Sequence, residues 1–335
     1  WKTPAFKAAT GFDPHVVVIK LGTNDTKPQN WKHADEYTAD YEAMIDHFAA
    51  LPAKPKIWLC SPAPVYQTRW GISEKSVVEG VIPKVQALAR RKELPVIDLY
   101  SVLSGKPEMF PDKIHPNAAG AKVMAKAVED TVFYRYNRLI ALNEVGGEPD
   151  HYGADVDLFH EAMQIRVEDQ PEGMLATSTH DTKRGEDARA RLYTLSEAPE
   201  HWQSLVRGYA EQLAPFRHSI DGGQMEAPEP ATEWGLYQSL LGVLPTDFDP
   251  ADTEACAAIA ERLAAYAEKA VREAKRWTSW TSPAEAYEAG VQDFVHALLD
   301  PKKTGDFLSG FWAAAQPFVA AGALNSLSQT AIKMA

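Results

Sequence analysis

The chain has 335 residues, enough for two ordinary domains, and its 45% hydrophobic and 24% charged residues are normal for a soluble globular protein. Its formal net charge of −12 argues against a general nucleic-acid binder, which needs a basic face for phosphates, and against docking on an anionic membrane. No nucleic acid and no membrane are therefore expected as partners.

The two cysteines, Cys60 and Cys256, lie far apart and form no disulfide framework, which favours a reducing compartment such as the cytoplasm. We find no apolar run that looks long enough to span a bilayer. The sequence begins at Trp1 with neither Met nor a signal peptide. This favours a chain cut at its start, with a processed start as the alternative.

Residues 1–125 show the alternation of strands and helices that is typical of an open parallel sheet. Strands are predicted at 16–21, 56–60 and 94–99, and helices at 34–50, 74–92 and from about residue 117. The first strand is nearly continuous in apolar, β-branched residues, so we expect it to be buried. Functional loops are expected at the carboxyl ends of these strands.

Residues 126–335 are predicted to be mostly helical. Besides one strand at 174–179 and a loop at 222–230, the expected helices cover about 253–276, 284–299 and 307–320. The charge changes at the same place in the chain. Residues 1–125 hold 16 basic and 13 acidic residues, a net of +3, whereas the remainder holds 18 and 33, a net of −15. This shift supports a domain boundary near residue 125.

The first pair of motifs is Gly-Thr-Asn-Asp at 22–25, after a predicted strand, and Asp-Lys-Ile-His-Pro at 112–116. Asp112 and His115 are three residues apart, so the carboxylate can hold the imidazole tautomer and leave the ring free to act as a general base. Asn24 can aim its amide at a developing oxyanion. The alternative is structural: Asp112 caps the following helix and His115 is a surface loop residue.

Residues 16–31 and 109–120 resemble the third and fifth conserved blocks of SGNH/GDSL hydrolases, and the strands between them fit the same family. The resemblance implies a partial flavodoxin-like, three-layer parallel sheet. It also implies that Asn24 donates to the oxyanion, that His115 is the base and that Asp112 is its partner. The family's nucleophile lies upstream in a Gly-Asp-Ser motif that this sequence lacks. Ser61, Ser101 and Ser104 do not lie in such a motif, and none of them is taken as the nucleophile.

The second motif spans residues 176–191 (ATSTHDTKRGEDARAR), where the predicted strand ends in His180 and Asp181. Barrel enzymes hold their chemistry at the carboxyl ends of strands. The structural alternative is a charged helix start, with Asp181 as the N-cap and acidic residues paired with arginines at helical spacing.

This motif resembles the fourth conserved region of glycoside hydrolase family thirteen, in the form found in maltooligosyltrehalose synthases. Residues 123–139, 142–149, 273–280 and 322–330 resemble the same enzymes. The resemblance implies a mostly α-helical fragment of a (β/α)8-barrel enzyme. Asp181 would be the third active-site carboxylate, His180 would contact the same sugar, and Lys183 and Arg184 would belong to a substrate loop. The family's nucleophile and general acid come from earlier strands. Ala127 stands where the family usually has Gly.

We therefore expect a partial SGNH/GDSL domain at 1–125, a partial glycosidase barrel segment at 126–194 and a helical region at 195–335, with the join within Val123–Lys126. The expected function is a fusion of incomplete enzymes, inactive alone because nucleophile and general acid are absent. The resemblances imply small-molecule substrates as partners, either a maltooligosaccharide or an acyl ester. No metal or cofactor is expected, and Asp181 should lie far from Asp112 and His115.

Three other hypotheses stay open. The first is that the chain is an active SGNH/GDSL-type serine ester hydrolase that uses an unrecognised serine. The second is that it is an active α-glucan-rearranging enzyme completed by another chain. The third is a non-enzymatic helical binding module built from residues 190–335.

Overall fold

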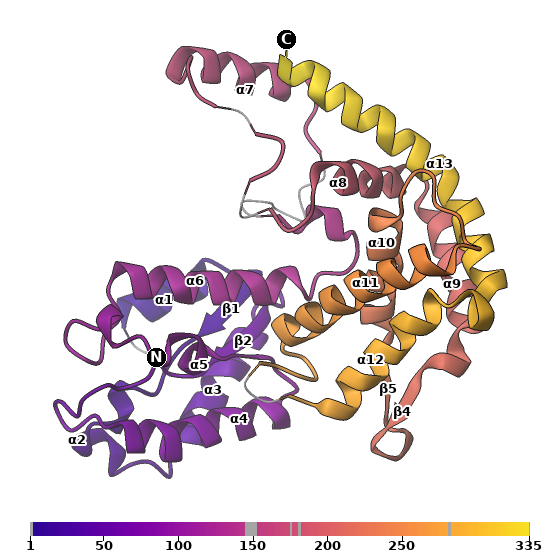
Figure 1. Cartoon of the computed structure of the whole chain (residues 1–335). Coiled ribbons are helices and arrows are strands. Elements are labelled where there is room, and N and C mark those ends of the chain that lie inside the picture. Colours follow the sequence, from indigo (N-terminus) through magenta and orange to yellow (C-terminus); the bar gives the residue numbers. More distant parts are fainter. Residues whose placement is uncertain (1–2, 145–152, 175, 180–181, 281–282, 335) are drawn as a thin grey trace. The chain divides into compact units, whose positions relative to one another are not determined.

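The computed structural model describes residues 3–144, 153–174, 176–179, 182–280 and 283–334. It shows a mostly helical α/β protein with a small parallel sheet (Figure 1). The chain divides into two compact units, Trp1–Val132 and Phe133–Ala335.

The sheet of the first unit has three parallel strands in the order β1-β2-β3, the number expected from the sequence. They are β1 (Val16–Ile19), β2 (Lys56–Cys60) and β3 (Val96–Ile97). The helices of this unit are α1 (Pro4–Gly11), α2 (Pro28–Trp31), α3 (Tyr37–Ala49), α4 (Ile82–Arg91), α5 (Leu99–Leu103) and α6 (Ala118–Phe133). A π-helical stretch, Ser76–Val81, runs directly into α4.

Helices pack on both faces of β2, because successive side chains of a strand point to opposite faces. Ile57 and Leu59 join a core cluster with side chains of α3 and α4. Trp58 and Cys60 join another cluster, which contains Ala127 of α6. Helix α6 thus continues through the predicted join, and its residues on both sides of that join pack into the first unit.

The first strand corrects one expectation. Of the four residues of β1, only Ile19 is buried, whereas Val16 and Val18 are 50% and 39% exposed. The strand pairs with β2 alone and lies at the edge of the sheet. An apolar run shows that a strand prefers burial, but its place in the sheet decides how many of its side chains are covered.

The second unit is built of helices and one antiparallel hairpin. Its helices are α7 (Val156–Asp169), α8 (Glu186–Tyr193), α9 (Pro199–Gln212), α10 (Pro230–Val243), α11 (Thr253–Ala274), α12 (Glu285–Leu298) and α13 (Pro301–Met334). The hairpin strands are β4 (His218–Ile220) and β5 (Met225–Ala227). A single large cluster of buried side chains, centred on aromatic residues of α9, α10, α12 and α13, forms the core.

Helix α11 shows how local sequence sets an element in this unit. Asp252 caps its start by accepting from the backbone N–H groups of Glu254 and Ala255, each at 3.0 Å. Ile259, Leu263 and further residues four apart place a buried stripe along one side. The helix ends at Lys275, whose backbone is left-handed. The predicted bounds, 253–276, agree with the structure to within two residues.

Two expectations for the second unit are wrong. No strand forms among the described residues of 174–179, and Met174 is 95% exposed. An apolar run becomes a strand only where a neighbouring strand takes its hydrogen bonds, and the described residues offer none here. The predicted loop at 222–230 instead contains β5, which pairs with β4 around the two glycines Gly222 and Gly223.

Helix α13 also differs from expectation, because it is long and apolar enough, by length and composition alone, to cross a membrane. No such run was expected from the sequence. Its first half packs into the unit, with Phe307, Leu308 and Phe311 at most 1% exposed. In its second half Leu324 and Leu327 are 67% and 68% exposed, and one such helix is weak evidence for a membrane span.

One side chain of helix α8 links it to the end of α10. The guanidinium of Arg191 donates to the carbonyl oxygens of Leu241 and Leu244, at 2.9 and 2.6 Å, at the end of α10. Those carbonyls have no partner within their own helix, so a cation is well placed there. Burial lowers the pKa of Arg191. Helix α13 packs directly on α8, where Gly322 touches the backbone of Arg191.

Candidate functional site

Asp112 and His115 meet in the first unit. Oδ2 of Asp112 lies 2.6 Å from Nδ1 of His115, and Oδ1 accepts from the backbone N–H groups of Ile114 and His115 at 3.0 and 2.7 Å. The turn is closed by Lys113, whose φ is +68°. The arrangement fixes the ring through Nδ1 and leaves Nε2 as the nitrogen that can exchange a proton.

The helix that follows is capped by another residue. Oδ1 of Asn117 accepts from the backbone N–H of Gly120 at 3.0 Å, at the start of α6. Asp112 is occupied with Ile114 and His115, so its carboxylate is not the helix cap that the structural alternative required. The imidazole is exposed, with 57% of the side-chain surface accessible.

The pKa of the Asp112 carboxyl is held well below its usual range, first by the backbone N–H of His115 and then by the His115 ring and the backbone N–H of Ile114. The folded pKa is thus lower than the unfolded one. The ionised Asp112 carboxylate therefore stabilises the folded chain at neutral pH, above the ordinary carboxyl pKa. This stabilisation is lost as the pH falls toward the pKa of Asp112 in the folded chain.

Because backbone donors contribute to the low pKa of Asp112, the effect of His115→Ala on that pKa can be predicted. The substitution is expected to raise the pKa of Asp112 only in part, because both backbone N–H donors remain. A carboxyl-carbon NMR titration of the variant and the parent measures this. An Asp112 in the variant that titrates at the ordinary value of about 3.9 would contradict the backbone as the main cause.

Asn24 begins the 3-10 turn Asn24–Thr26, directly after β1, and is exposed. Its carbonyl oxygen accepts from Nδ2 of Asn30 at 3.0 Å, which ties the two ends of the loop together. Gly22, with φ +121°, allows the chain to turn here. A Cβ at Gly22 would lie 2.4 Å from a methyl group of Val81, so only glycine fits.

A turn at residues 69–72 links the Asn24 loop to His115. Gly71 packs on Pro28, which follows Asn24, and a Cβ at Gly71 would lie 2.3 Å from the Pro28 ring. The ring centroid of Trp70 lies 6.1 Å from that of His115. Sequence reasoning missed Trp70. The available signal was the Trp-Gly pair in a loop rich in proline and polar residues.

The three serines named from the sequence have structural partners. Ser61 is buried, donates to Oδ1 of Asp98 at 3.0 Å and accepts from the backbone N–H of Tyr100 at 2.9 Å. Oγ of Ser101 donates to Oδ2 of Asp98 at 2.6 Å, and Oγ of Ser104 to the Tyr100 carbonyl at 2.8 Å. Within the described ranges, none of the three serines is hydrogen-bonded to His115.

His180 and Asp181 lie outside the described residues, so their expected distance from the first motif is not measured. Lys183 and Arg184 are described. Their backbone N–H groups donate to the two carboxylate oxygens of Glu144, at 2.8 and 3.2 Å. Glu144 lies in the 142–149 motif, but sequence reasoning gave it no role. Its carboxylate now anchors the loop that follows the His-Asp pair.

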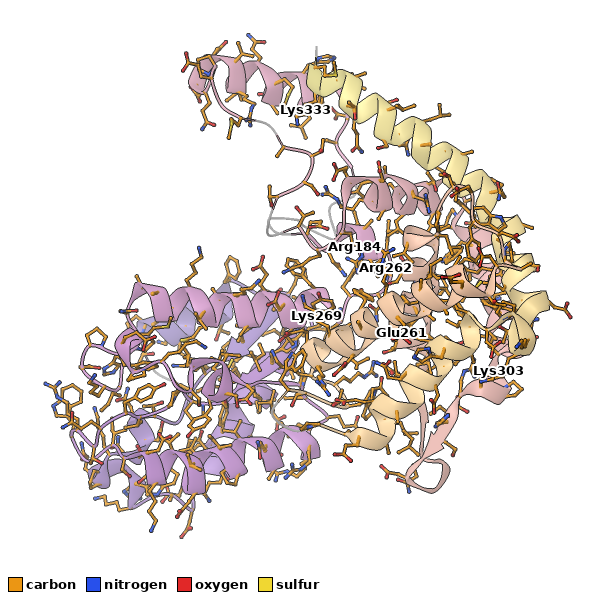
Figure 2. All side chains as sticks on the ribbon, in the orientation of Figure 1. Arg184, Glu261, Arg262, Lys269, Lys303 and Lys333 are labelled. Atoms are coloured by element: carbon orange, nitrogen blue, oxygen red, sulfur yellow. The ribbon has the colours of Figure 1, made fainter. Side chains whose placement is uncertain are left out.

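The Arg184 guanidinium is held inside the second unit. It donates to the carbonyl oxygen of Ile140 and to the Tyr266 hydroxyl, each at 2.8 Å. Figure 2 shows Arg184 beside α11, the helix that carries Arg262 and Lys269. The Lys183 ammonium lies 5.3 Å from the Phe133 ring centre. These contacts fix the loop backbone at Lys183 and Arg184 as well as placing their two positive charges.

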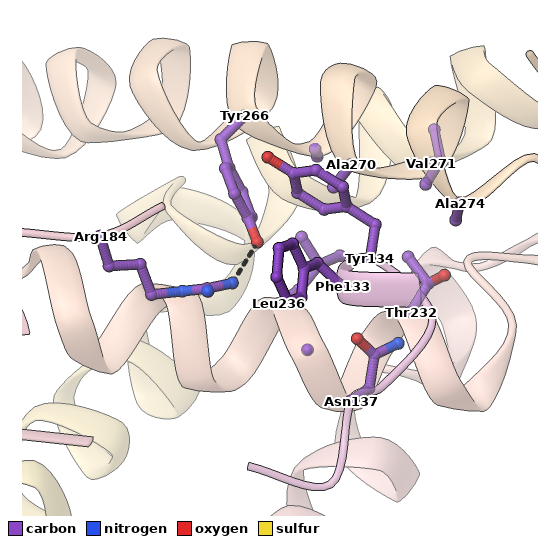
Figure 3. Close-up of a pocket in the computed structure, with 12 residues that line it drawn as sticks. Phe133, Tyr134, Asn137, Arg184, Thr232, Leu236, Tyr266, Ala270, Val271 and Ala274 are labelled. Atoms are coloured by element: carbon purple, nitrogen blue, oxygen red, sulfur yellow. Dashed lines mark hydrogen bonds between the residues drawn. The ribbon is translucent and has the colours of Figure 1, made fainter. Parts of the chain in front are cut away.

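Arg184 and Tyr266 line a small cavity with Phe133, Tyr134 and Thr232 (Figure 3). Its volume is about 30 Å³. The cavity is a packing gap between α10 and α11.

Comparisons with known proteins find similarity to two kinds of enzyme. Residues 3–123 match the GDSL-like Lipase/Acylhydrolase family. This region carries a GDSL-like domain. An acetylxylan esterase of Xylanibacter ruminicola is 40% identical to this chain, over 37% of the chain and 30% of that protein.

A second homology extends beyond the GDSL-like domain. A protein of Mycobacterium tuberculosis assigned as a maltooligosyl trehalose synthase is 43% identical over 178 residues, which is 53% of this chain but 21% of that protein. The structure of a hypothetical maltooligosyl trehalose synthase from Sulfolobus tokodaii matches with a TM-score of 0.51 and 25% identity, over 93% of this chain and 38% of that one. The expected chimera of two enzyme families is thus confirmed.

Proposed function

We propose that the GDSL-like domain holds the general-base side of a serine-type ester hydrolase site. His115 is the base, Asp112 orients it, and Asn24 donates to the oxyanion. The observation that carries this is the 2.6 Å contact between Nδ1 of His115 and Oδ2 of Asp112, with Nε2 left for the substrate side. The acetylxylan esterase relative supports an acetylated saccharide as the class of ester.

We further propose that these 335 residues do not turn over esters by themselves. The sequence has no Gly-Asp-Ser motif, and Ser61, Ser101 and Ser104 are engaged with Asp98 and Tyr100. A base without its nucleophile loses covalent catalysis. In a serine hydrolase, removal of the nucleophile costs about 10⁶-fold in kcat.

Hydrolysis of p-nitrophenyl acetate tests this proposal. We expect the chain to hydrolyse it no faster than its His115→Ala variant, apart from the slow reaction of a free imidazole. A serine-reactive phosphonate followed by peptide mass spectrometry should label no single serine. Rapid hydrolysis, blocked by stoichiometric phosphonate labelling of one serine, would instead establish an active esterase.

We infer that residues 126–335 are the supporting part of a maltooligosyltrehalose synthase-like enzyme, with a barrel segment at 126–194, a helical region at 195–335 and the join within Val123–Lys126. Asp181 and His180 are assigned to the sugar, and Lys183 and Arg184 to the substrate loop. The two bonds from Glu144 to that loop support the assignment, because they hold the segment after Asp181 in one conformation.

The synthase-like proposal has its own test. Maltopentaose incubated with the chain is expected to show no product that ends in trehalose, as followed by proton NMR of the reducing end. Binding of maltopentaose without conversion would agree with a supporting fragment. Formation of the trehalose-ended product would show that the catalytic set is complete.

A further inference from the structure

Residues 69–72 form a tight two-residue hairpin beside His115. The backbone N–H of Arg69 donates to the Ile72 carbonyl at 3.1 Å, and the N–H of Ile72 donates to the Arg69 carbonyl at 2.9 Å. Both central residues have positive φ, +53° at Trp70 and +78° at Gly71. This is the signature of a type I′ turn, whose first central position prefers Asn, Asp or Gly.

Tryptophan is an unfavourable residue for that position. A bulky side chain in the left-handed region brings its Cβ close to the backbone carbonyl, so the native turn is strained. The turn persists because its neighbours fix it: Ile72 is fully buried, and Gly71 packs on Pro28. Backbone strain of this kind, with a bulky residue at positive φ, is found most often at functional sites.

Burial does not account for the tryptophan. Its side chain is 53% exposed, so most of the apolar gain of a core tryptophan is absent. The Arg69 guanidinium lies 4.4 Å from the indole centre and holds the ring in place. The ring stands beside His115, with centroids 6.1 Å apart and planes 49° from parallel.

The position beside His115 indicates which part of an ester the ring would meet. In ester hydrolysis the base returns its proton to the leaving alcohol, so the alcohol part of the substrate must approach the imidazole. The Arg69 guanidinium lies over one face of the indole. The other face suits a pyranose, which can offer a C–H face to an aromatic ring.

We propose that Trp70 is the stacking platform for a saccharide ring on the alcohol side of the ester site, and that Arg69, stacked over the opposite face of the indole, holds the platform in position. This rests on the proposed function, in which His115 serves the ester of an acetylated saccharide. It adds the residue that binds the saccharide, which would carry equatorial hydroxyls as a xylo-oligosaccharide does. The strained backbone is what aims the indole at the imidazole.

Calorimetric titration with xylotetraose tests the platform, because binding needs no turnover. Trp70→Asn, which suits the turn, is expected to weaken binding at least about 10-fold, the loss that one aromatic contact explains. Trp70→Phe keeps an aromatic face and should stay within about 3-fold. Trp280→Asn is the matched control, since Trp280 is also half exposed and also lies beside an arginine, Arg272 at 4.6 Å.

Thermal unfolding of the same variants separates binding from folding. Trp70→Asn should keep or raise the melting temperature of the first unit, because Asn tolerates the left-handed backbone. The proposal is overturned if xylotetraose shows no saturable binding, if Trp70→Asn binds it as the parent does, or if that variant melts earlier. Absence of saccharide binding would leave the Asp112–His115 assignment standing, and absence of ester hydrolysis would not affect Trp70.

Discussion

Glu233→Ala is expected to lower the free energy of unfolding of the second unit by about 3–5 kcal/mol. Glu233 is 2% exposed and accepts from Nε and Nη2 of Arg217, at 2.8 and 3.1 Å, and from the Tyr237 hydroxyl at 2.5 Å. Burial and the adjacent carboxylate raise the pKa of Tyr237, which keeps its hydroxyl protonated as a donor. Removing the carboxylate takes the acceptor from the buried Tyr237 hydroxyl. It also leaves the Arg217 guanidinium, whose side chain is 15% exposed, with only the Ala210 carbonyl and the exposed Glu226 among the acceptors described for it.

Glu226→Ala is the matched control for this prediction. Glu226 also approaches Arg217, with Oε2 3.5 Å from Nη1, but 56% of its side chain is exposed. A surface pair of this kind contributes at most about 1 kcal/mol. Native-state hydrogen exchange of the α10 amides measures the unit's own stability in both variants, without assuming that the whole chain unfolds in one step. Equal losses would contradict burial as the cause.

Gly322→Ala is expected to destabilise the same unit. Overpacking of a core typically costs about 1–3 kcal/mol, and we expect a loss at the upper end of this range. A Cβ at Gly322 would lie 2.6 Å from Cα and 3.1 Å from the backbone nitrogen of Arg191. These are backbone atoms, so no rotamer change relieves the clash. Helix α8 cannot shift freely either, because the Arg191 side chain is bonded to the carbonyls of Leu241 and Leu244.

Gly310→Ala, in the same helix, is expected to have the opposite sign. Gly310 is exposed and a Cβ there meets no atom within 4 Å. The substitution therefore gains only the helix propensity of alanine, roughly 0.5–1 kcal/mol. Urea unfolding followed by circular dichroism compares the two variants. If Gly322→Ala were stabilising as well, α8 and α13 would not be in the close contact described.

The sequence by itself determined the features that depend on neighbours along the chain. Asp112 and His115 are three residues apart, so their contact needs only one turn, and it was predicted correctly. Helix α11 follows from its apolar stripe and its Asp252 cap, both of which are local. The change of motifs and charge between the halves also showed two homologies in one chain, which the comparisons confirm.

Tertiary structure decided what depends on partners far away in sequence. The exposure of Val16 and Val18 follows from the edge position of β1, and no strand forms in the described part of 174–179, where none lies beside it. Trp70 approaches His115, and Glu144 approaches Lys183, across roughly forty residues of chain. Such contacts leave no periodic trace in a single sequence, because only the packing of whole elements brings the residues together.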